Sequence, residues 1–275
     1  MLRFLYNDFM YLIPNEFSSY ISQDCNRKEF IQSFLNKAGL DTAVISLEGK
    51  NHIYVKFPIH QYNPMFKIKT VIAHYDRVEG SPGANDNSAA NFVLLQWAIS
   101  LFNKKSFHNV RLIFTDGEEL GEGGICEQGS FALAKLFQKL GITNDELFVF
   151  DCMGRGDVPI ICENNFPKGM SKIFLKKVQD LELIAEKIIK NASGGKWFKL
   201  HSGYSDNASF LVNNIPAVAI TMLPSNEVSD ALNGKIPYTW QLFHTKDDNL
   251  ESLNPGSFEL FHKILRNLED LKILK

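Results

Sequence analysis

The chain has 275 residues, of which 45% are hydrophobic and 22% charged, and its formal net charge at pH 7 is −2. A chain of this length suits one α/β domain with a large buried core. Its charges are mixed along the whole sequence and form no basic stripe, and no apolar run reaches the roughly 20 residues that span a bilayer, so neither nucleic acid nor a membrane is an expected partner.

The N-terminal segment, residues 1–45, is expected to form a helical leader packed across the main sheet. Asn7, Asp8 and Pro14 interrupt its apolar residues, and it lacks a small-residue cleavage site, so it does not read as a signal peptide. A helix is predicted over 22–39, with Gly39 marking its end. The four cysteines show no paired C-x-x-C spacing, which favours reduced thiols and a cytoplasmic protein.

After the leader, short runs rich in Val, Ile, Leu and Phe alternate with polar loops and helical stretches. The clearest strand-like runs are 53–57, 67–73, 110–115, 147–150 and 217–222. Helical periodicity is found at 88–102, 129–140 and 181–190, and a last helix follows Asn254 and Pro255, an N-cap and a first-turn proline. This rhythm predicts a single α/β domain over residues 1–275, with a mixed, mostly parallel β-sheet and helices on both faces.

Two stretches, 191–205 and 224–243, lack regular patterning. Loops of this length inside a compact domain are usually functional or disordered, so both are candidate rims of a binding site. They carry aromatic side chains that could shape a substrate pocket or equally cover hydrophobic surface. These are Trp197, Phe198, Tyr204, Tyr238 and Trp240.

Potential metal ligands stand at the ends of four short apolar runs. KTVIA ends on His74, NVRLIFTDG on Glu118 and Glu119, LFVF on Asp151, and QLF on His244. In open α/β sheets, ligands bind outside the carboxyl ends of the strands, so side chains in these positions can converge on one crevice. Adjacent residues of an extended segment point apart, so one of the two glutamates can bind metal while the other handles protons.

A fifth candidate ligand, Asp86, lies in the loop PGANDNSAA before a predicted helix. A charged group at the end of a buried strand costs several kcal/mol to desolvate unless it is paired or coordinated, and metal coordination accounts for all five residues. Two imidazoles and three carboxylates, without a thiolate, suit catalytic zinc, with manganese or cobalt as alternatives. Two divalent ions would leave about one positive charge for hydroxide to balance, so the sequence predicts a water-activating centre.

Six motifs in this order resemble those of the co-catalytic zinc aminopeptidases, the family that also includes the glutaminyl cyclases. They are AHYD at 73–76, PGANDNSAA at 82–90, TDGEELG at 115–121, FVFD at 148–151, SDNASF at 205–210 and FHTKDDN at 243–249. The resemblance covers roughly 67–253 and implies a zinc-dependent exopeptidase fold with two divalent ions, most commonly zinc.

Carried over to this sequence, the resemblance implies that Asp86 bridges both ions. Glu119 and His244 would complete one site, and His74 and Asp151 the other.

It further implies that Glu118 is the general base and that Asp76 orients the imidazole of His74. Asp206 matches a position near the active site and is a candidate substrate contact. The sequence departs from the family after Asp86, where Asn-Ser-Ala-Ala replaces the common Ala-Ser-Gly, and at Asn207, where histidine is frequent. The longer segment GEGGICEQGS changes the expected shape of the pocket.

The expected activity is that of a metal-dependent aminopeptidase acting on peptides with a free N-terminus. A glutaminyl cyclase, which uses one zinc and no attacking water, is the first alternative. A related carboxypeptidase or deacylase usually carries an inserted dimerisation domain, for which these residues leave no room. A catalytically inactive binding module would be expected to have lost ligands or base, and none is lost here.

Overall fold

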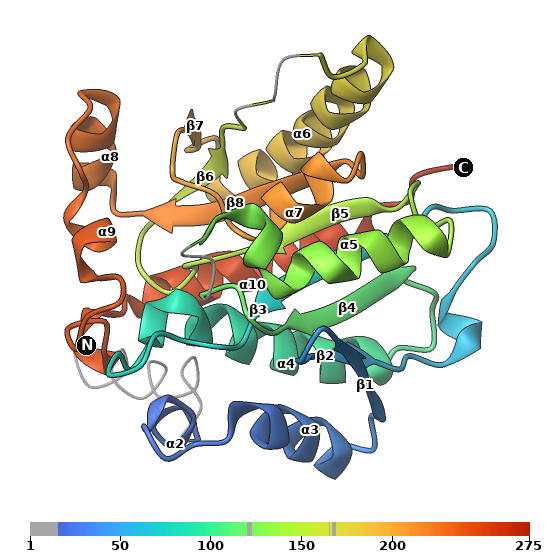
Figure 1. Cartoon of the computed structure of the whole chain (residues 1–275), viewed down its shortest axis with the longest axis horizontal. Coiled ribbons are helices and arrows are strands. Elements are labelled where there is room, and N and C mark those ends of the chain that lie inside the picture. The colour runs from blue at the N-terminus through green and yellow to red at the C-terminus, as the bar shows by residue number, and fades with distance from the viewer. Residues whose placement is uncertain (1–15, 120–122, 165, 167–168) are drawn as a thin grey trace.

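An eight-stranded sheet organises the computed structural model, which describes residues 16–119, 123–164, 166 and 169–275 (Figure 1). The strand order is β1-β2-β4-β3-β5-β8-β6-β7. The strands are β1 (Thr42–Leu47), β2 (Lys50–Val55), β3 (Lys69–His74), β4 (Val110–Thr115), β5 (Glu146–Phe150), β6 (Val158–Cys162), β7 (Phe198–Leu200) and β8 (Ala217–Leu223).

The four central strands, β4, β3, β5 and β8, run parallel to one another. β2 joins β4 and β6 joins β8 in antiparallel fashion, while β7 runs parallel to β6. The prediction of a mixed, mostly parallel sheet in one α/β domain is confirmed. All residues of β3, β5 and β8 are buried, because helices cover both faces.

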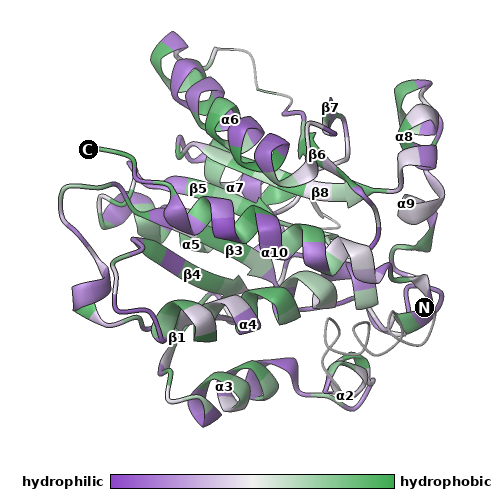
Figure 2. Ribbon diagram, turned by 180° about the vertical axis from the view of Figure 1, so that it is seen from behind, coloured by the Kyte–Doolittle hydropathy of each residue, from purple (hydrophilic) through white to green (hydrophobic). Residues whose placement is uncertain are grey.

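Helices α4 (Ala89–Phe102) and α10 (Pro255–Asp270) lie side by side on one face of the sheet (Figure 2), and α5 (Gly129–Lys139) and α7 (Asp206–Val212) cover the other. The central strands divide their side chains between these two layers. In β3, Val71 and Ala73 belong to the core under α4, whereas Ile72 belongs to the core under α5. Because side chains alternate between the two faces of a strand, the apolar side chains on each face are buried under the helices that cover it.

The leader consists of α2 (Phe17–Ile21) and α3 (Arg27–Lys37). The predicted start of the helix at residue 22 is wrong, because Asn26 caps α3 by accepting a hydrogen bond from the backbone nitrogen of Glu29. Residues 1–15 of the predicted leader lie outside the described residues. The leader packs mainly on the outer side of α4 rather than across the sheet, for example through Phe30, whose ring centroid is 5.7 Å from that of Phe92 (Figure 1). It meets the sheet at the edge strand, where Gln32 of α3 donates a hydrogen bond to Oγ1 of Thr42 in β1 (3.3 Å).

The stretches expected to be irregular contain regular elements. α6 (Lys172–Ser193) runs into the first and is followed by β7, while α8 (Ser225–Leu232) and α9 (Tyr238–Leu242) occupy the second. Elements as short as α9 and β7 complete too few periods for an apolar repeat to be visible in sequence. No helix of the described ranges is both long and apolar enough to cross a membrane.

Candidate metal centre

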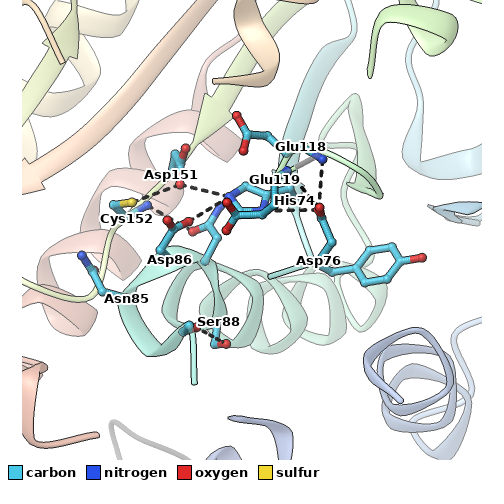
Figure 3. A network of polar contacts seen from close by, with 12 residues as sticks. His74, Asp76, Asn85, Asp86, Ser88, Glu118, Glu119, Asp151 and Cys152 are labelled. Atoms are coloured by element: carbon cyan, nitrogen blue, oxygen red, sulfur yellow. Dashed lines mark hydrogen bonds and ion pairs between the residues drawn. The ribbon is translucent and has the colours of Figure 1, made fainter. Parts of the chain in front are cut away.

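Acidic and imidazole side chains gather at the carboxyl ends of the parallel strands (Figure 3). His74 is the last residue of β3 and pairs in register with Thr115, the last residue of β4. Glu118 and Glu119 follow β4 after a short turn, and Asp151 comes directly after β5. Because these strands are parallel neighbours, their ends meet at one edge of the sheet.

Asp86 lies between two pairs of candidate ligands. Its Oδ1 is 3.1 Å from Nε2 of His74, and that nitrogen is 3.4 Å from Oδ1 of Asp151. Its Oδ2 is 3.4 Å from Nε2 of His244, and that nitrogen is 3.0 Å from Oε2 of Glu119. One carboxylate thus faces two separate imidazole-carboxylate pairs with its two oxygens, which is the placement of a bridging ligand.

The backbone around Asp86 is held by Asp248, which is fully buried. The two oxygens of Asp248 accept hydrogen bonds from the backbone nitrogens of Asn85 (2.7 Å) and Asp86 (3.0 Å). Gly83 opens this turn with a φ of 58°, a left-handed conformation that glycine adopts without strain.

The two asparagines beside Asp86 hold the segment that carries Asp151. Asn87 donates from Nδ2 to the backbone oxygen of Phe150 (2.9 Å) and accepts from the backbone nitrogen of Cys152 (3.1 Å). The backbone nitrogen of Gly154 donates to Oδ1 of Asn85 (2.8 Å). The segment of the candidate bridge and the segment after β5 are therefore fixed to each other by side chains that bind no metal.

Asp76 contacts three of the candidate site residues. Its Oδ1 lies 3.5 Å from Nδ1 of His74, on the side of the ring opposite Asp86. Its two oxygens also accept hydrogen bonds from the backbone nitrogens of Glu118 (3.2 Å) and Glu119 (3.0 Å). A carboxylate in this position fixes the ring orientation of a ligand imidazole and the path of the glutamate turn.

The side chain of Glu118 points away from the candidate ligands labelled in Figure 3, which are His74, Asp86, Glu119 and Asp151. Its Oε1 accepts a hydrogen bond from Nε2 of Gln128 (2.9 Å), and Oε1 of Gln128 accepts one from Ser209 (2.8 Å). Burial raises the pKa of Glu118 well above its usual range, and the negative charges of Asp151 and Asp206 act in the same direction. Glu118 is thus a carboxylate that holds a proton readily.

Asp206 begins α7 and is fully buried, without contributing to the wall of the cavity described below. Its Oδ2 accepts a hydrogen bond from Oγ1 of Thr115 (2.5 Å). Burial raises the pKa of Asp206 to about 6. The structure therefore places this predicted substrate residue beneath the site, where it acts on the charge of Glu118.

The charges around the two imidazoles show why the cluster suits cations. Hydrogen bonding to Asp86 and Glu119 raises the pKa of His244 to about 10. Burial lowers the pKa of His74, but the carboxylates of Asp151, Asp76 and Asp86 together outweigh it and hold the pKa well above its usual range. Burial and the charge of Asp86 raise the pKa of Glu119 to about 7. Without metal, the negative charge of these clustered carboxylates is neutralised by bound protons. Bound divalent ions would neutralise the same charge in place of the protons.

A cavity of about 420 Å³ opens beside the cluster. Glu118, Glu119, Asp86, Asp151 and His244 form its polar side. The remaining wall comes partly from both stretches that the sequence marked as rims and partly from residues outside them, with small side chains and aromatic rings. This wall includes Val78, Cys152, Cys162, Ser202, Gly203, Tyr204, Ser205, Thr221, Trp240 and Phe243.

Sequence reasoning gave no role to Cys152, Gln128 and Asp248. Asp248 stands in the quoted motif FHTKDDN, so a signal existed, whereas nothing in the sequence pointed to Gln128.

Cys152 follows Asp151, and its Sγ donates to Oδ1 of Asp151 (3.2 Å). Among the described residues, Asp86, Asp151 and Cys152 form one group with metal-ligand spacing, and His74, Asp86 and Glu119 form another. Burial raises the pKa of Cys152 well above its usual range, so it is present as a thiol.

Comparison with known proteins agrees with this fold. Residues 59–268 match the family described as Peptidase family M28. Aminopeptidase YwaD of Bacillus subtilis is 42% identical over 73 residues, which are 26% of this chain and only 16% of that protein.

Two solved structures share the fold at low sequence identity. The LapA aminopeptidase of Legionella pneumophila aligns with a TM-score of 0.68 and 18% identity, covering 98% of this chain and 72% of that one. A glutaminyl cyclase of Bacteroides thetaiotaomicron aligns with a TM-score of 0.71 and 15% identity, covering 95% and 96% of the two chains.

Proposed function

Since the chain belongs to peptidase family M28, we propose that it is a metal-dependent aminopeptidase that hydrolyses the first peptide bond of substrates with a free N-terminus. The observation that carries the proposal is the position of Asp86 between two imidazole-carboxylate pairs. This arrangement offers two ion sites that share one carboxylate, and two-metal sites are common in hydrolases and aminopeptidases.

The proposed centre is held by Asp86 together with His74, Asp151, Glu119 and His244, and zinc fits this donor set. When bound, such ions lower the pKa of a water molecule and polarise a carbonyl group. Every other contribution comes from the chain itself.

Glu118 is the proposed general base. It lines the cavity beside the proposed ion sites, where a carboxylate can accept the proton of the attacking water and then deliver it to the leaving amine. The hydrogen bond from Gln128 to Oε1 fixes the side chain, so the carboxylate does not have to be ordered during the reaction. Asp76 is proposed to hold His74 in the orientation that presents Nε2 to the centre.

The carboxylate of Asp151 is proposed to help hold the α-amine of the substrate. It lies at the cavity wall, and a cationic amine is drawn to a wall that carries several carboxylates. Tyr204, Trp240 and Phe243 would shape the pocket for the first side chain of the peptide.

A glutaminyl cyclase is the second candidate, because a cyclase of Bacteroides thetaiotaomicron shares the fold over almost the whole of both chains. A leucine aminopeptidase precursor of the same organism does so as well, so the extent of the match does not separate the two activities. In that reaction the α-amine of an N-terminal glutamine attacks the side-chain amide carbon, a ring forms and ammonia leaves. Glu118 would take the proton from the amine and pass it to the ammonia.

Metal stoichiometry measured with both activities tests the proposal. The chain is assayed with an aminoacyl anilide and with a peptide that begins with glutamine, before and after chelation. Two ions per chain with chelator-sensitive hydrolysis are the expected result. One ion with ammonia release from the glutamine peptide would replace the peptidase by the cyclase, and neither activity with bound ions would indicate a binding module.

A further inference from the structure

Arg27, the first residue of α3, connects the leader to the segment after His74. Its side chain is buried, and Nη1 donates hydrogen bonds to the backbone oxygens of Tyr75 and Asp76, both at 3.1 Å. These are the two residues that follow His74, and Asp76 is the carboxylate that faces its ring.

The other nitrogen of the same guanidinium reaches the turn that carries Asp86. Nη2 donates to the backbone oxygens of Pro82 (2.8 Å) and Gly83 (3.4 Å) and to Oγ of Ser88 (2.8 Å). Ser88 in turn donates to the backbone oxygen of Gly83 (2.5 Å) and so closes the turn. The acceptors of Nη2 lie on both sides of Asp86 in the sequence.

We propose that Arg27 is a positioning residue of the metal centre, which fixes the distance between the segment of His74 and the segment of Asp86. The inference rests on the metal-dependent function proposed above. A guanidinium suits this task because it is planar, always charged and presents donors in a rigid fork. A lysine ammonium is a point donor on a flexible stem and cannot span both segments in one geometry.

The surroundings of Arg27 hold it in place from the side of the leader. Its guanidinium lies over the ring of Tyr20, 5.0 Å from the ring centroid. Asn91 of α4 donates both to the hydroxyl of Tyr20 (3.1 Å) and to the backbone oxygen of His74 (3.0 Å). The leader thus reaches the His74 segment by two routes.

A reciprocal contact ties the same segment back to the leader. Arg77 donates to the backbone oxygens of Ile21 (2.7 Å), Ser22 (2.8 Å) and Gln23 (2.9 Å), in the connection between α2 and α3. The leader precedes residues 59–268, the part that matches the family, so this support is built by a segment outside that match.

The test compares metal affinity with fold stability in two variants. Arg27→Lys removes the fork, whereas Phe34→Ala weakens the contact of the leader with Phe92, whose ring centroid is 5.9 Å from that of Phe34, and touches neither ligand segment. Zinc affinity is measured by competition with a chromophoric chelator, the ligand geometry by the visible spectrum of the cobalt-loaded protein, and stability by the Tm of the metal-free protein.

Arg27→Lys is expected to weaken zinc binding by about 10- to 100-fold, the range found when groups that orient metal ligands are changed, and to alter the cobalt spectrum. Phe34→Ala is expected to lower the Tm while its affinity and spectrum stay those of the parent chain. The proposal is overturned if Arg27→Lys keeps the affinity and spectrum, or if Phe34→Ala weakens binding equally at equal loss of Tm. A parent chain that binds no ion would instead refute the metal-dependent function, and this inference with it.

Discussion

Asp248 accepts a 3.0 Å hydrogen bond from the backbone nitrogen of Asp86, a residue 162 positions earlier in the chain. Its other oxygen accepts one from Asn85 at 2.7 Å. Asp248 also lies four residues after His244. One buried carboxylate therefore joins the turn of the proposed bridging ligand to the segment of a second ligand.

Replacing Asp248 with asparagine should damage both the turn and the metal site. The amide can accept only one of the two backbone hydrogen bonds and presents its own N–H groups to the other donor. A buried donor left unsatisfied costs about 1–3 kcal/mol, so urea unfolding of the metal-free variant should show a loss of that order. Zinc affinity should fall as well. Asp247→Asn, at the exposed neighbouring position, is the matched control, and equal behaviour of the two variants would refute this role.

The substitution of glutamate by glutamine should have different effects at Glu118 and at Glu119. Glu118→Gln should retain both ions yet lose turnover by about 10²- to 10⁴-fold, because a general base contributes in that range. Glu119→Gln should lower the occupancy of one ion site, because the amide is a poorer ligand next to His244. Elemental analysis and steady-state kinetics on each variant decide the matter. Full activity in Glu118→Gln would rule out the proposed base.

Gly83→Ala should disrupt the turn at Asp86. The φ of 58° is unfavourable for alanine, and a Cβ atom would lie 2.5 Å from the backbone oxygen of Asp86. The loss of stability should exceed about 1 kcal/mol. Gly80→Ala is the control, because Gly80 also has a positive φ, of 84°, but has open space around its Cβ position. Equal loss in the two variants would mean that the backbone conformation alone matters and that the contact with Asp86 does not.

His108 should make the fold sensitive to acid. Burial lowers the pKa of His108 to about 3, and its Nδ1 accepts a hydrogen bond from the backbone nitrogen of Val110, as a neutral ring can. The unfolded chain, with a histidine pKa of about 6.5, binds more protons than the native state between these values. Stability should therefore fall as the pH drops below about 6.5, by up to about 1.4 kcal/mol per pH unit from this residue.

The measurement is urea unfolding of the metal-free protein from pH 7 to pH 4.5. His108→Gln cannot titrate, so its stability should decline less steeply than that of the parent chain, although it starts lower. His60→Gln, at an exposed position, is the control substitution. Parallel pH curves for the parent chain and His108→Gln would exclude His108 as the source of the acid sensitivity.

The central strands are readable in the sequence because burial on both faces leaves short apolar runs, and a candidate ligand stands out where it ends β3 or directly follows β5. His74 and Asp151 are such cases. The end of α3 was signalled by Gly39, but its start was set by the capping bond of Asn26, which competed with several other polar residues nearby. α8 and α9 are too short to show a period.

The contacts of Arg27 could not be predicted from the sequence. Four of its five acceptors are backbone oxygens. Because every residue has a backbone oxygen, the residue types at these positions do not indicate which side chain binds there. Gln128 is similar, because its contact with Glu118 depends on the path of a turn rather than on a pattern of residue types. Side chains that support ligands through the backbone become visible only when the chain is folded.

The long separation between Asp86 and Asp248 also bears on synthesis. His74, Asp86, Glu119 and Asp151 leave the ribosome before the segment that carries His244 and Asp248, so a growing chain carries an acidic, unfinished cluster while residues 152–248 are still being made. Contacts of such high sequence separation form late in folding. The proposed centre can therefore be completed only after residue 248 has emerged, and it would bind both ions only then.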